Sequence, residues 1–341
     1  MTGLDAAHVR ARLERYLSTT LDAACRVERF DVMADGHAGL TFGFDLVGAR
    51  DGAYILKVGP PGVPRRGSTD VYRQAPLLRA LHAEGLPVPD VPWAEQGEEA
   101  LGVPFIVMQR LPGRTFIVWE PHASFATLDR EHIRSLWLQD IRVLARLHRV
   151  DWQVRLAGWE APFTLAAELE RWGSILRHAL DPAWLEAGQR LARMLAEQVP
   201  DGAPVGLVHG DFQPGNTLYD EGRLTGVIDW DLAGIGAQGC DVGWLLMTVD
   251  PAAWAEGWRP VAPVPRDEVV DAYRDAGGPA LRDLAWYQAF SQFKLGAIAC
   301  LNVKLHRDGR RHDPIWERFA SSIATLFARG LALMQQNRSA A

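Results

Sequence analysis

The chain has 341 residues, of which 48% are hydrophobic and 23% are charged, and its formal net charge at pH 7 is −6. This length is comfortable for two domains, and the hydrophobic content is enough for sizeable cores, which excludes a disordered chain. The negative net charge and the dispersed basic residues argue against a nucleic-acid partner, and no apolar run approaches the ~18 residues that a membrane span needs.

The N-terminal residues predict a helix. Apolar residues recur at helical spacing from residue 5 to residue 17, and Asp5 is placed to cap the first turn. Charged residues within these turns interrupt any apolar core, so the segment is not a secretory signal peptide.

A small sheet is expected next. Alternating and β-branched runs predict a three-stranded meander over residues 25–33, 40–46 and 53–58. Gly36 and Gly39 fall in its first turn, where glycines let backbone N–H groups approach a phosphate but are as often ordinary hairpin glycines.

Lys57 ends the third predicted strand between apolar neighbours. The chain contains only three lysines, Lys57, Lys294 and Lys304, whereas its other basic residues are arginine. A strand lysine is most often a solvated edge residue. Its scarcity here indicates a place where a compact point charge is wanted.

The next segment runs from a helix to a strand and a turn. Residues 72–81 have a helical pattern that Pro76 either kinks or starts as part of the first turn. An extended connector over 86–92 precedes an apolar strand over 104–108. The segment that follows, Gln109 to Gly113, is by itself an ordinary turn after a strand.

The remainder is mainly helical. Helical patterns are expected over residues 128–150, 163–180, 183–198, 242–247, 266–276, 280–306 and 314–336. Asp241 stands just before the apolar helix at 242–247, where it most simply caps that helix, although it could also brace a neighbouring loop.

Between these helices, three short strands carry polar residues at their ends. Apolar runs over 205–208, 217–219 and 224–228 predict the strands, and Asp211, Asn216 and Asp229 lie where they end. Carboxylates this close repel each other in a partly dry site unless a cation lies between them. Asn216 and Asp229 offer hard oxygen ligands suited to Mg²⁺, and Asp211 can accept a proton.

The spacing of these residues carries a resemblance to a known family. His209-Gly-Asp211, four further residues, Asn216 and then Asp229 reproduce the arrangement of kinase catalytic and metal-binding loops. Gly210 and the Ile-Asp-Trp-Asp segment ending at Asp231 make the chain resemble the aminoglycoside phosphotransferase and choline kinase-like family of small-molecule kinases.

That resemblance implies an α+β, bilobal protein kinase-like fold. A small β-rich N-terminal lobe, residues 1–112, would bind the nucleotide, and a large mainly helical C-terminal lobe, residues 113–341, would carry catalysis and the acceptor site. The implied activity is transfer of the γ-phosphate of ATP to a hydroxyl group of a small molecule.

The resemblance also implies a role for each matched residue. Asp211 would orient the acceptor hydroxyl and take its proton, and His209 would fix the loop by hydrogen bonding. The remaining roles are Mg²⁺ binding by Asn216 and Asp229, phosphate binding by Lys57, cover of the nucleotide by the turn with Gly36 and Gly39, and adenine pairing by backbone groups at Gln109 and Leu111.

One position departs from the family pattern. Kinases of this shape pair the strand lysine with a glutamate on the following helix, but Gln74 stands at that position. An amide binds an ammonium group without neutralising it, so we expect Lys57 to lack a full counter-charge in the absence of nucleotide. Glu84 is a poorer substitute because it lies further along the chain.

Three other activities use parts of the same pattern of residues. Gln74 permits a nucleotide-binding pseudokinase or regulatory module without transfer activity. Metal-dependent hydrolysis by His209, Asp211 and Asp229 lacks a second histidine motif to complete the ligands. A protein kinase would need an activation loop that closes in Ala-Pro-Glu, and no such segment follows Asp229.

The acceptor stays open at this stage. Acidic residues between 231 and 283 suit a cationic aminoglycoside, whereas Lys304, Arg307 and Arg311 share a helical face that suits an anionic acceptor. Related kinase domains joined to acyl-CoA dehydrogenases make a hydroxylated acyl compound another candidate. Nothing in the sequence indicates the oligomeric state.

The three cysteines indicate the redox environment of the protein. Cys25, Cys240 and Cys300 are far apart and follow no metal-binding spacing. This argues against a disulfide framework and for a reducing environment, so we expect a cytoplasmic protein without a membrane partner.

Overall fold

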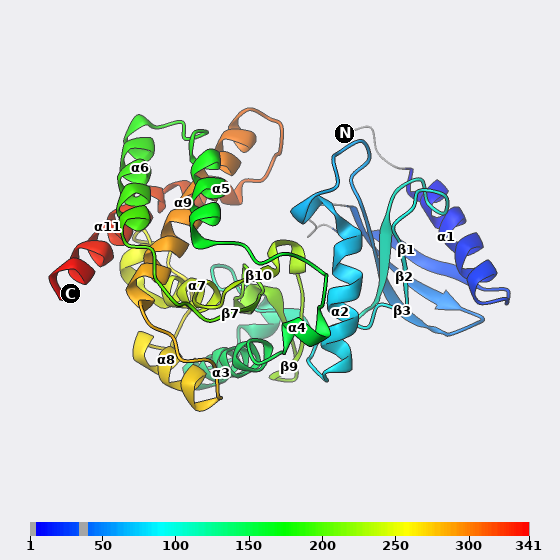
Figure 1. Cartoon of the computed structure of the whole chain (residues 1–341). Helices are drawn as coiled ribbons and strands as arrows, with labels where there is room; N and C mark the ends of the chain where they lie inside the picture. The colour runs from blue at the N-terminus through cyan, green and yellow to red at the C-terminus, as the bar shows by residue number, and fades with distance from the viewer. Residues whose placement is uncertain (1–4, 34–39, 341) are drawn as a thin grey trace. The chain divides into compact units, whose positions relative to one another are not determined.

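The structure is a computed structural model that describes residues 5–33 and 40–340, so Gly36 and Gly39 lie outside the described residues. The chain divides into two units (Figure 1). The small unit contains residues 1–113, 155–159 and 225–232, and the large unit contains residues 114–154, 160–224 and 233–341. That the first binds nucleotide and the second the acceptor stays a prediction.

The small unit is a five-stranded antiparallel sheet with a helix on one face (Figure 1). Its strand order is β1-β2-β3-β5-β4, and the strands are β1 (Arg26–Val32), β2 (Leu40–Val47), β3 (Gly52–Val58), β4 (Trp93–Glu95) and β5 (Phe105–Gln109). The predicted meander is therefore confirmed, and β4 and β5 extend it beyond β3.

Helix α1 (Ala6–Thr20) covers this sheet as the periodicity predicted. Asp5 caps it, since its carboxylate accepts a hydrogen bond from the N–H of Ala7 at 3.2 Å. Val9, Leu13 and Leu17 are fully buried in one cluster with the inward residues of β1, β2, β3 and β5. Each large apolar side chain buried in this way contributes about 1.5–3 kcal/mol, so the stripe on α1 holds the helix in place.

Helix α2 (Gln74–Ala83) and a returning segment complete the small unit. Pro76 is the third residue of α2, so it forms part of the first turn and does not kink the helix. Strand β9 (Arg223–Val227) begins in the large unit and continues into the small one, where the N–H of Val227 donates to the carbonyl of Pro87 at 2.7 Å. This bond ties residues 225–232 to the extended connector.

The large unit is built around α9 (Leu284–Arg307), which is buried along most of its length. Other helices pack against it: α5 (Leu165–Leu176), α6 (Pro182–Glu197), α7 (Gly239–Val249), α10 (Ile315–Ala320) and α11 (Ile323–Ala340). In Figure 1, α5 and α6 lie beside the orange α9. This buried helix has polar residues that its apolar surroundings do not explain, among them Lys294.

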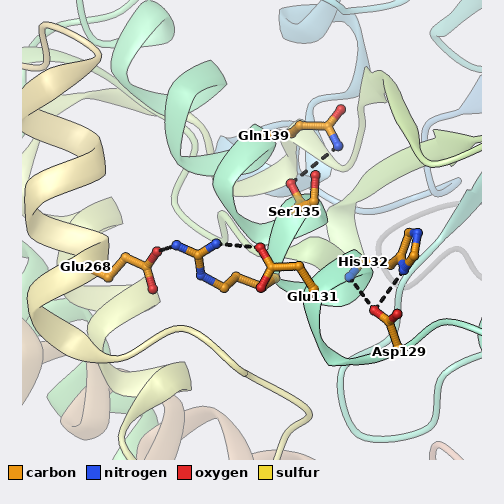
Figure 2. A network of polar contacts seen from close by, with 7 residues as sticks. Asp129, Glu131, His132, Ser135, Gln139 and Glu268 are labelled. Carbon is orange, nitrogen blue, oxygen red and sulfur yellow. Dashed lines mark hydrogen bonds and ion pairs between the residues drawn. The ribbon is translucent and has the colours of Figure 1, made fainter.

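Helix α3 (Arg130–Leu147) packs against α8 (Arg266–Asp275). Figure 2 shows how it begins: Asp129 accepts hydrogen bonds from the N–H of His132 at 2.9 Å and from its ring at 2.7 Å, while Arg134 bridges Glu131 and Glu268. The cap contributes about 1 kcal/mol, and the exposed ion pairs contribute less.

Short strands carry the polar motif. Strand β7 (Val205–Val208) pairs antiparallel with β10 (Gly234–Ala237), and β6 (Arg114–Thr115) pairs with β8 (Thr217–Asp220) in a three-stranded sheet of order β6-β8-β9. Strand β10 was not predicted because its Gly-Ile-Gly-Ala sequence has little strand character. The aromatic ring of Phe163 covers it, and a Cβ atom on Gly236 would lie 2.1 Å from that ring.

One predicted helix is wrong in its extent. Residues 314–336 were expected to form a single helix, but the chain breaks between α10 and α11 at Ser321 and Ser322. The buried hydroxyl of Ser322 accepts a hydrogen bond from the N–H of Ala255 at 3.0 Å, a contact with a residue far away in sequence. Short α4 (Trp152–Arg155) lies between α3 and α5.

Within residues 5–33 and 40–340, no helix has both the length and the apolar character required to cross a membrane.

Candidate active site

The loop after β7 brings together three of the predicted residues. The N–H of Asp211 donates to Nδ1 of His209 at 3.3 Å, and the carbonyl of Asp211 accepts from Nδ2 of Asn216 at 2.8 Å. Gln213 donates to the Asp211 carboxylate at 3.0 Å. His209 is fully buried, and its ring accepts from the backbone of this loop.

Buried Asp241 fixes the backbone of this loop. Its carboxylate accepts from the N–H of His209 at 2.7 Å and from the N–H of Gly210 at 2.8 Å. Because successive amides share one carboxylate, the peptide planes before Asp211 have a fixed orientation. The interpretation of Asp241 as a helix cap is wrong, since Gln238 precedes α7 and makes no side-chain cap.

His148 and Tyr273 form a buried hydrogen-bonded chain with Asp241. Nε2 of His148 lies 3.2 Å from the Asp241 carboxylate, and Nδ1 lies 2.7 Å from the hydroxyl of Tyr273. Burial opposes ionisation of Asp241, but the hydrogen bond and charge of His148, together with His209, hold its pKa below the ordinary value. Asp241 is therefore an ionised brace for this loop, which is the alternative that the sequence offered beside a helix cap.

A second buried acid lies under strand β8. The hydroxyl of Tyr219 donates to Asp140 at 2.7 Å and accepts from the hydroxyl of Thr217 at 2.8 Å. Burial raises the pKa of Asp140 to about 7, although its hydrogen bonds with Tyr219 and Thr217 work in the other direction. The helical periodicity of α3 gave no signal for this group.

In the small unit, Lys57 is paired with an acid that the sequence comparison did not assign to it. Its Nζ lies 2.5 Å from Oδ1 of Asp231, and Nε2 of Gln74 donates to the same oxygen at 2.5 Å. Lys57 is only 7% exposed. The expectation that Lys57 lacks a counter-charge is therefore wrong, and Gln74 acts on Asp231 instead of binding Lys57 directly.

The local chain explains why Asp231 reaches β3. Trp230 is buried and its indole N–H donates to the carbonyl of Val227 at 3.1 Å, which closes a tight turn after β9. That turn directs the next carboxylate toward Lys57. Glu84, the alternative partner considered for Lys57, instead pairs with Arg155 at 2.7 Å.

Asp229 has an unusual backbone conformation. Its φ is 61°, in the left-handed region that a non-glycine residue adopts at a cost of about 1–3 kcal/mol. Such outliers concentrate at functional sites, where the surrounding structure maintains them. Asp229 shares a positive φ with five other described non-glycine residues, so its role as a metal ligand stays a prediction.

The segment expected to bind adenine follows strand β5. The N–H of Gln109 donates to the carbonyl of Asp90 at 2.8 Å, and the N–H of Arg110 donates to the carbonyl of Ala53 at 2.9 Å. Both amides therefore have partners within the small unit. Pairing of adenine with backbone groups at Gln109 and Leu111 stays a prediction.

The donor set fits Mg²⁺ better than a transition metal. No group of three or more histidine, cysteine, aspartate or glutamate side chains suited to a metal ion occurs in the described part of the chain. Mg²⁺ is commonly bound by one or two side-chain oxygens together with phosphates and water. Nδ2 of Asn216 donates to the Asp211 carbonyl, so Oδ1 is the atom of this side chain that could bind a metal ion.

The structure thus places His209, Asp211 and Asn216 in one loop of the large unit, and Lys57, Gln109, Leu111 and Asp229 in the small unit. Their assigned roles stay predictions.

The chain is similar in sequence to part of a longer plant protein. A relative from Arabidopsis thaliana, named a probable acyl-CoA dehydrogenase, is 28% identical over 272 residues, which is 72% of this chain but 32% of that protein. The chain therefore spans about a third of that relative's length.

Solved structures share the fold. A candidate aminoglycoside phosphotransferase from Ralstonia eutropha superposes with a TM-score of 0.76 at 20% identity, covering 96% of this chain and 98% of that one. The aminoglycoside phosphotransferase APH(4)-Ia, solved with ADP and hygromycin B, gives 0.59 at 17% identity, covering 95% and 98%. The predicted kinase-like fold is confirmed.

The model of the phosphotransferase enzyme family matches residues 5–290, a span that contains the loop from His209 to Asn216 and the strained Asp229. The chain belongs to the phosphotransferase enzyme family.

Proposed function

We propose that this protein is an ATP-dependent phosphotransferase that moves the γ-phosphate to a hydroxyl group of a small molecule. The observation that carries the proposal is the loop in which Asp241 fixes two successive amides before Asp211. A carboxylate on so constrained a backbone is suited to a reaction that depends on positioning.

In the proposed reaction, Asp211 accepts a hydrogen bond from the acceptor hydroxyl and takes its proton as the new bond to phosphorus forms. Gln213 holds the Asp211 carboxylate in place, and His209 holds its backbone. The phosphate chain is bound by Lys57, which exchanges part of its contact with Asp231 for nucleotide oxygens.

The metal site of the proposal consists of Asn216 and Asp229. When bound, Mg²⁺ neutralises charge on the β- and γ-phosphates. Asn216 supplies Oδ1 because its amide nitrogen is held by the Asp211 carbonyl. The adenine ring would pair with the carbonyl of Gln109 and the N–H of Leu111, and the turn with Gly36 and Gly39 would cover the phosphates.

The pseudokinase alternative loses its main support. It rested on Gln74 in place of a glutamate, but Asp231 gives Lys57 the counter-charge that such a glutamate would supply. The chain also keeps Asp211, Asn216 and Asp229. A catalytically active enzyme is therefore the better-supported function.

The acceptor face suggested by basic residues loses support as well. Lys304 pairs with Asp308 at 3.4 Å, and Arg307 makes two 2.8 Å hydrogen bonds to Glu317. Arg311 donates to Asn302 at 3.3 Å. Each of these three basic side chains therefore already has a polar partner within the protein. We assign the acceptor only to the class of small hydroxylated molecules.

The decisive experiment measures ADP release by the purified protein with MgATP and three acceptor groups: aminoglycosides, macrolides and hydroxylated acyl compounds. Transfer to one group should fall on the order of 10²-fold or more in Asp211→Ala, since general-base catalysis commonly contributes that much. Nucleotide affinity should stay close to that of the wild type, because Asp211 faces the acceptor. A parallel loss of rate and nucleotide affinity would contradict the role assigned to Asp211.

A further inference from the structure

Lys294 is a buried cation that the proposed reaction leaves without a role. It lies on α9, is 6% exposed, and its Nζ donates to the carbonyl of Gly210 at 2.5 Å. Gly210 precedes Asp211 directly. The ammonium group is therefore bound to the peptide bond that joins Gly210 to the proposed base.

Opposite charges hold the two sides of Gly210. Its N–H donates to the carboxylate of Asp241 at 2.8 Å, and its carbonyl accepts from Lys294. Gly210 has a φ of 87°, a left-handed conformation that suits glycine. Because glycine is the most flexible residue of the loop, contacts at both its amide and its carbonyl are what fix the direction of Asp211.

The surroundings of Lys294 are shaped around its charge. Nζ lies 5.0 Å from the ring centroid of Trp172 and 4.9 Å from that of Trp244, within the range of cation–π attraction. Trp172 in turn donates its indole N–H to Glu168 at 2.8 Å. Two aromatic faces and a nearby carboxylate thus compensate for the lost hydration.

Fold stability alone gives little reason for a lysine here. Burial lowers the pKa of Lys294, and the charges of Glu168, Asp211 and Asp241 work in the other direction. Replacing a buried ionic group by a well-packed apolar one is often neutral or stabilising. A methionine would fill nearly the same volume without the desolvation cost, so the charge itself must have another use.

We propose that Lys294 is a positioning residue for phosphoryl transfer, which acts through the carbonyl of Gly210 to hold Asp211 toward the acceptor hydroxyl. This inference rests on the proposed function. It assigns Lys294 no contact with nucleotide or acceptor, so its loss should reduce kcat and leave the KM for ATP unchanged.

The test compares Lys294→Met and Lys294→Arg with Arg171→Met. Arg171 is the control because its guanidinium lies 4.7 Å from the centroid of the same Trp172 ring and pairs with Glu168 at 3.2 Å, while its side chain is 45% exposed and that of Lys294 is buried. We expect Lys294→Met to lower kcat ~10–100-fold, the scale of a misplaced catalytic group. Lys294→Arg, which restores a cation, should recover part of that loss, and Arg171→Met should behave as the wild type.

A second readout does not depend on turnover. Amide hydrogen exchange over residues 207–213 should accelerate in Lys294→Met relative to Arg171→Met, while exchange in α9 and α11 stays the same. Faster local exchange with no transfer by the wild type to any acceptor would leave the positioning contact intact and reject the proposed function. Wild-type kcat in Lys294→Met, or exchange that rises equally throughout the large unit, would overturn the positioning role.

If Lys294→Met does not fold, Lys294→Leu, which also removes both the charge and the donor to the Gly210 carbonyl, is measured in the same way. Full kcat in that variant would also reject the proposal.

Discussion

At the scale of single residues, Asp231 and Gln74 together replace the glutamate that other kinases of this shape carry on the helix after the lysine strand. The charge comes from the turn after β9, and the helix contributes a neutral hydrogen bond to it. Lys57 consequently depends on a residue 174 positions away in sequence. Spacing along the chain placed Asp231 in the matched Ile-Asp-Trp-Asp segment but gave no means of pairing it with Lys57.

The first prediction moves this negative charge from one residue to the other. Asp231→Asn should lower the free energy of unfolding by about 3–5 kcal/mol at most, because it leaves a buried ammonium group without its carboxylate. Adding Gln74→Glu should recover part of that loss, because the new carboxylate lies beside the same site. Urea denaturation of the two single variants and the double variant measures the coupling.

Glu84→Gln is the control for this cycle, because it removes a carboxylate whose pair with Arg155 is more exposed, and it should change stability by less than about 1 kcal/mol. Strictly additive effects of Asp231→Asn and Gln74→Glu would show that a carboxylate at position 74 does not replace that of Asp231 beside Lys57.

A second prediction concerns Asp140. Its folded pKa of about 7 lies above the ordinary value of 3.8, so the folded protein keeps a proton that the unfolded chain loses. The contribution of Asp140 to the free energy of unfolding is therefore greatest below pH 4. It falls as the pH rises toward 7, by no more than about 1.4 kcal/mol per pH unit. Asp140→Asn should remove this dependence and gain stability relative to the wild type between pH 5 and pH 8.

Urea denaturation at both pH values measures the difference. Asp201→Asn changes an exposed carboxylate of the same unit and should show no such gain. A constant difference between Asp140→Asn and the wild type would mean that Asp140 is already ionised in the folded protein at pH 5.

At the scale of elements, two glycines in neighbouring helices have opposite environments. A Cβ atom on Gly173 in α5 would meet no atom within 4 Å, whereas one on Gly188 in α6 would lie 2.7 Å from Leu176 and 3.1 Å from Phe327. Gly188 thus permits the close approach of α6 to α5 and α11. The helical pattern of the sequence treats both glycines alike.

The third prediction follows from this contrast. Gly173→Ala should raise the free energy of unfolding by about 0.5–1 kcal/mol, since alanine loses less backbone entropy in a helix. Gly188→Ala should lower it by about 1–3 kcal/mol, since its methyl group has no space. Thermal unfolding of the two variants checks both signs, and equal shifts would show that α5 and α6 do not pack as described.

At the scale of the whole molecule, local patterns predicted what local residues determine. The stripe of Val9, Leu13 and Leu17 located α1, and five residues at kinase spacing indicated the loop at Asp211 and the family. The missing features depend on distant contacts. Strand β10 pairs with β7, and Ser322, where the helix is interrupted, accepts a hydrogen bond from Ala255. Asp241 accepts hydrogen bonds from amides 31 and 32 positions earlier in the chain. No periodicity in a single segment carries information about such partners.

The last prediction tests the metal ligands through the stability of the complete chain. If Asn216 and Asp229 hold Mg²⁺ against the phosphates, MgATP should stabilise the protein by about 2.7 kcal/mol at a hundredfold excess over its Kd, and ATP with a chelator should stabilise it much less. In Asp229→Ala, MgATP should stabilise the protein little more than ATP with a chelator does. The substitution itself should relieve little backbone strain, since alanine tolerates the φ of 61° poorly. Asp220→Asn, an exposed carboxylate at the end of β8, is the control and should keep the full MgATP shift. Thermal unfolding with and without Mg²⁺ supplies the measurement, and an undiminished MgATP shift in Asp229→Ala would reject Asp229 as a metal ligand while leaving the phosphate contact of Lys57 unaffected.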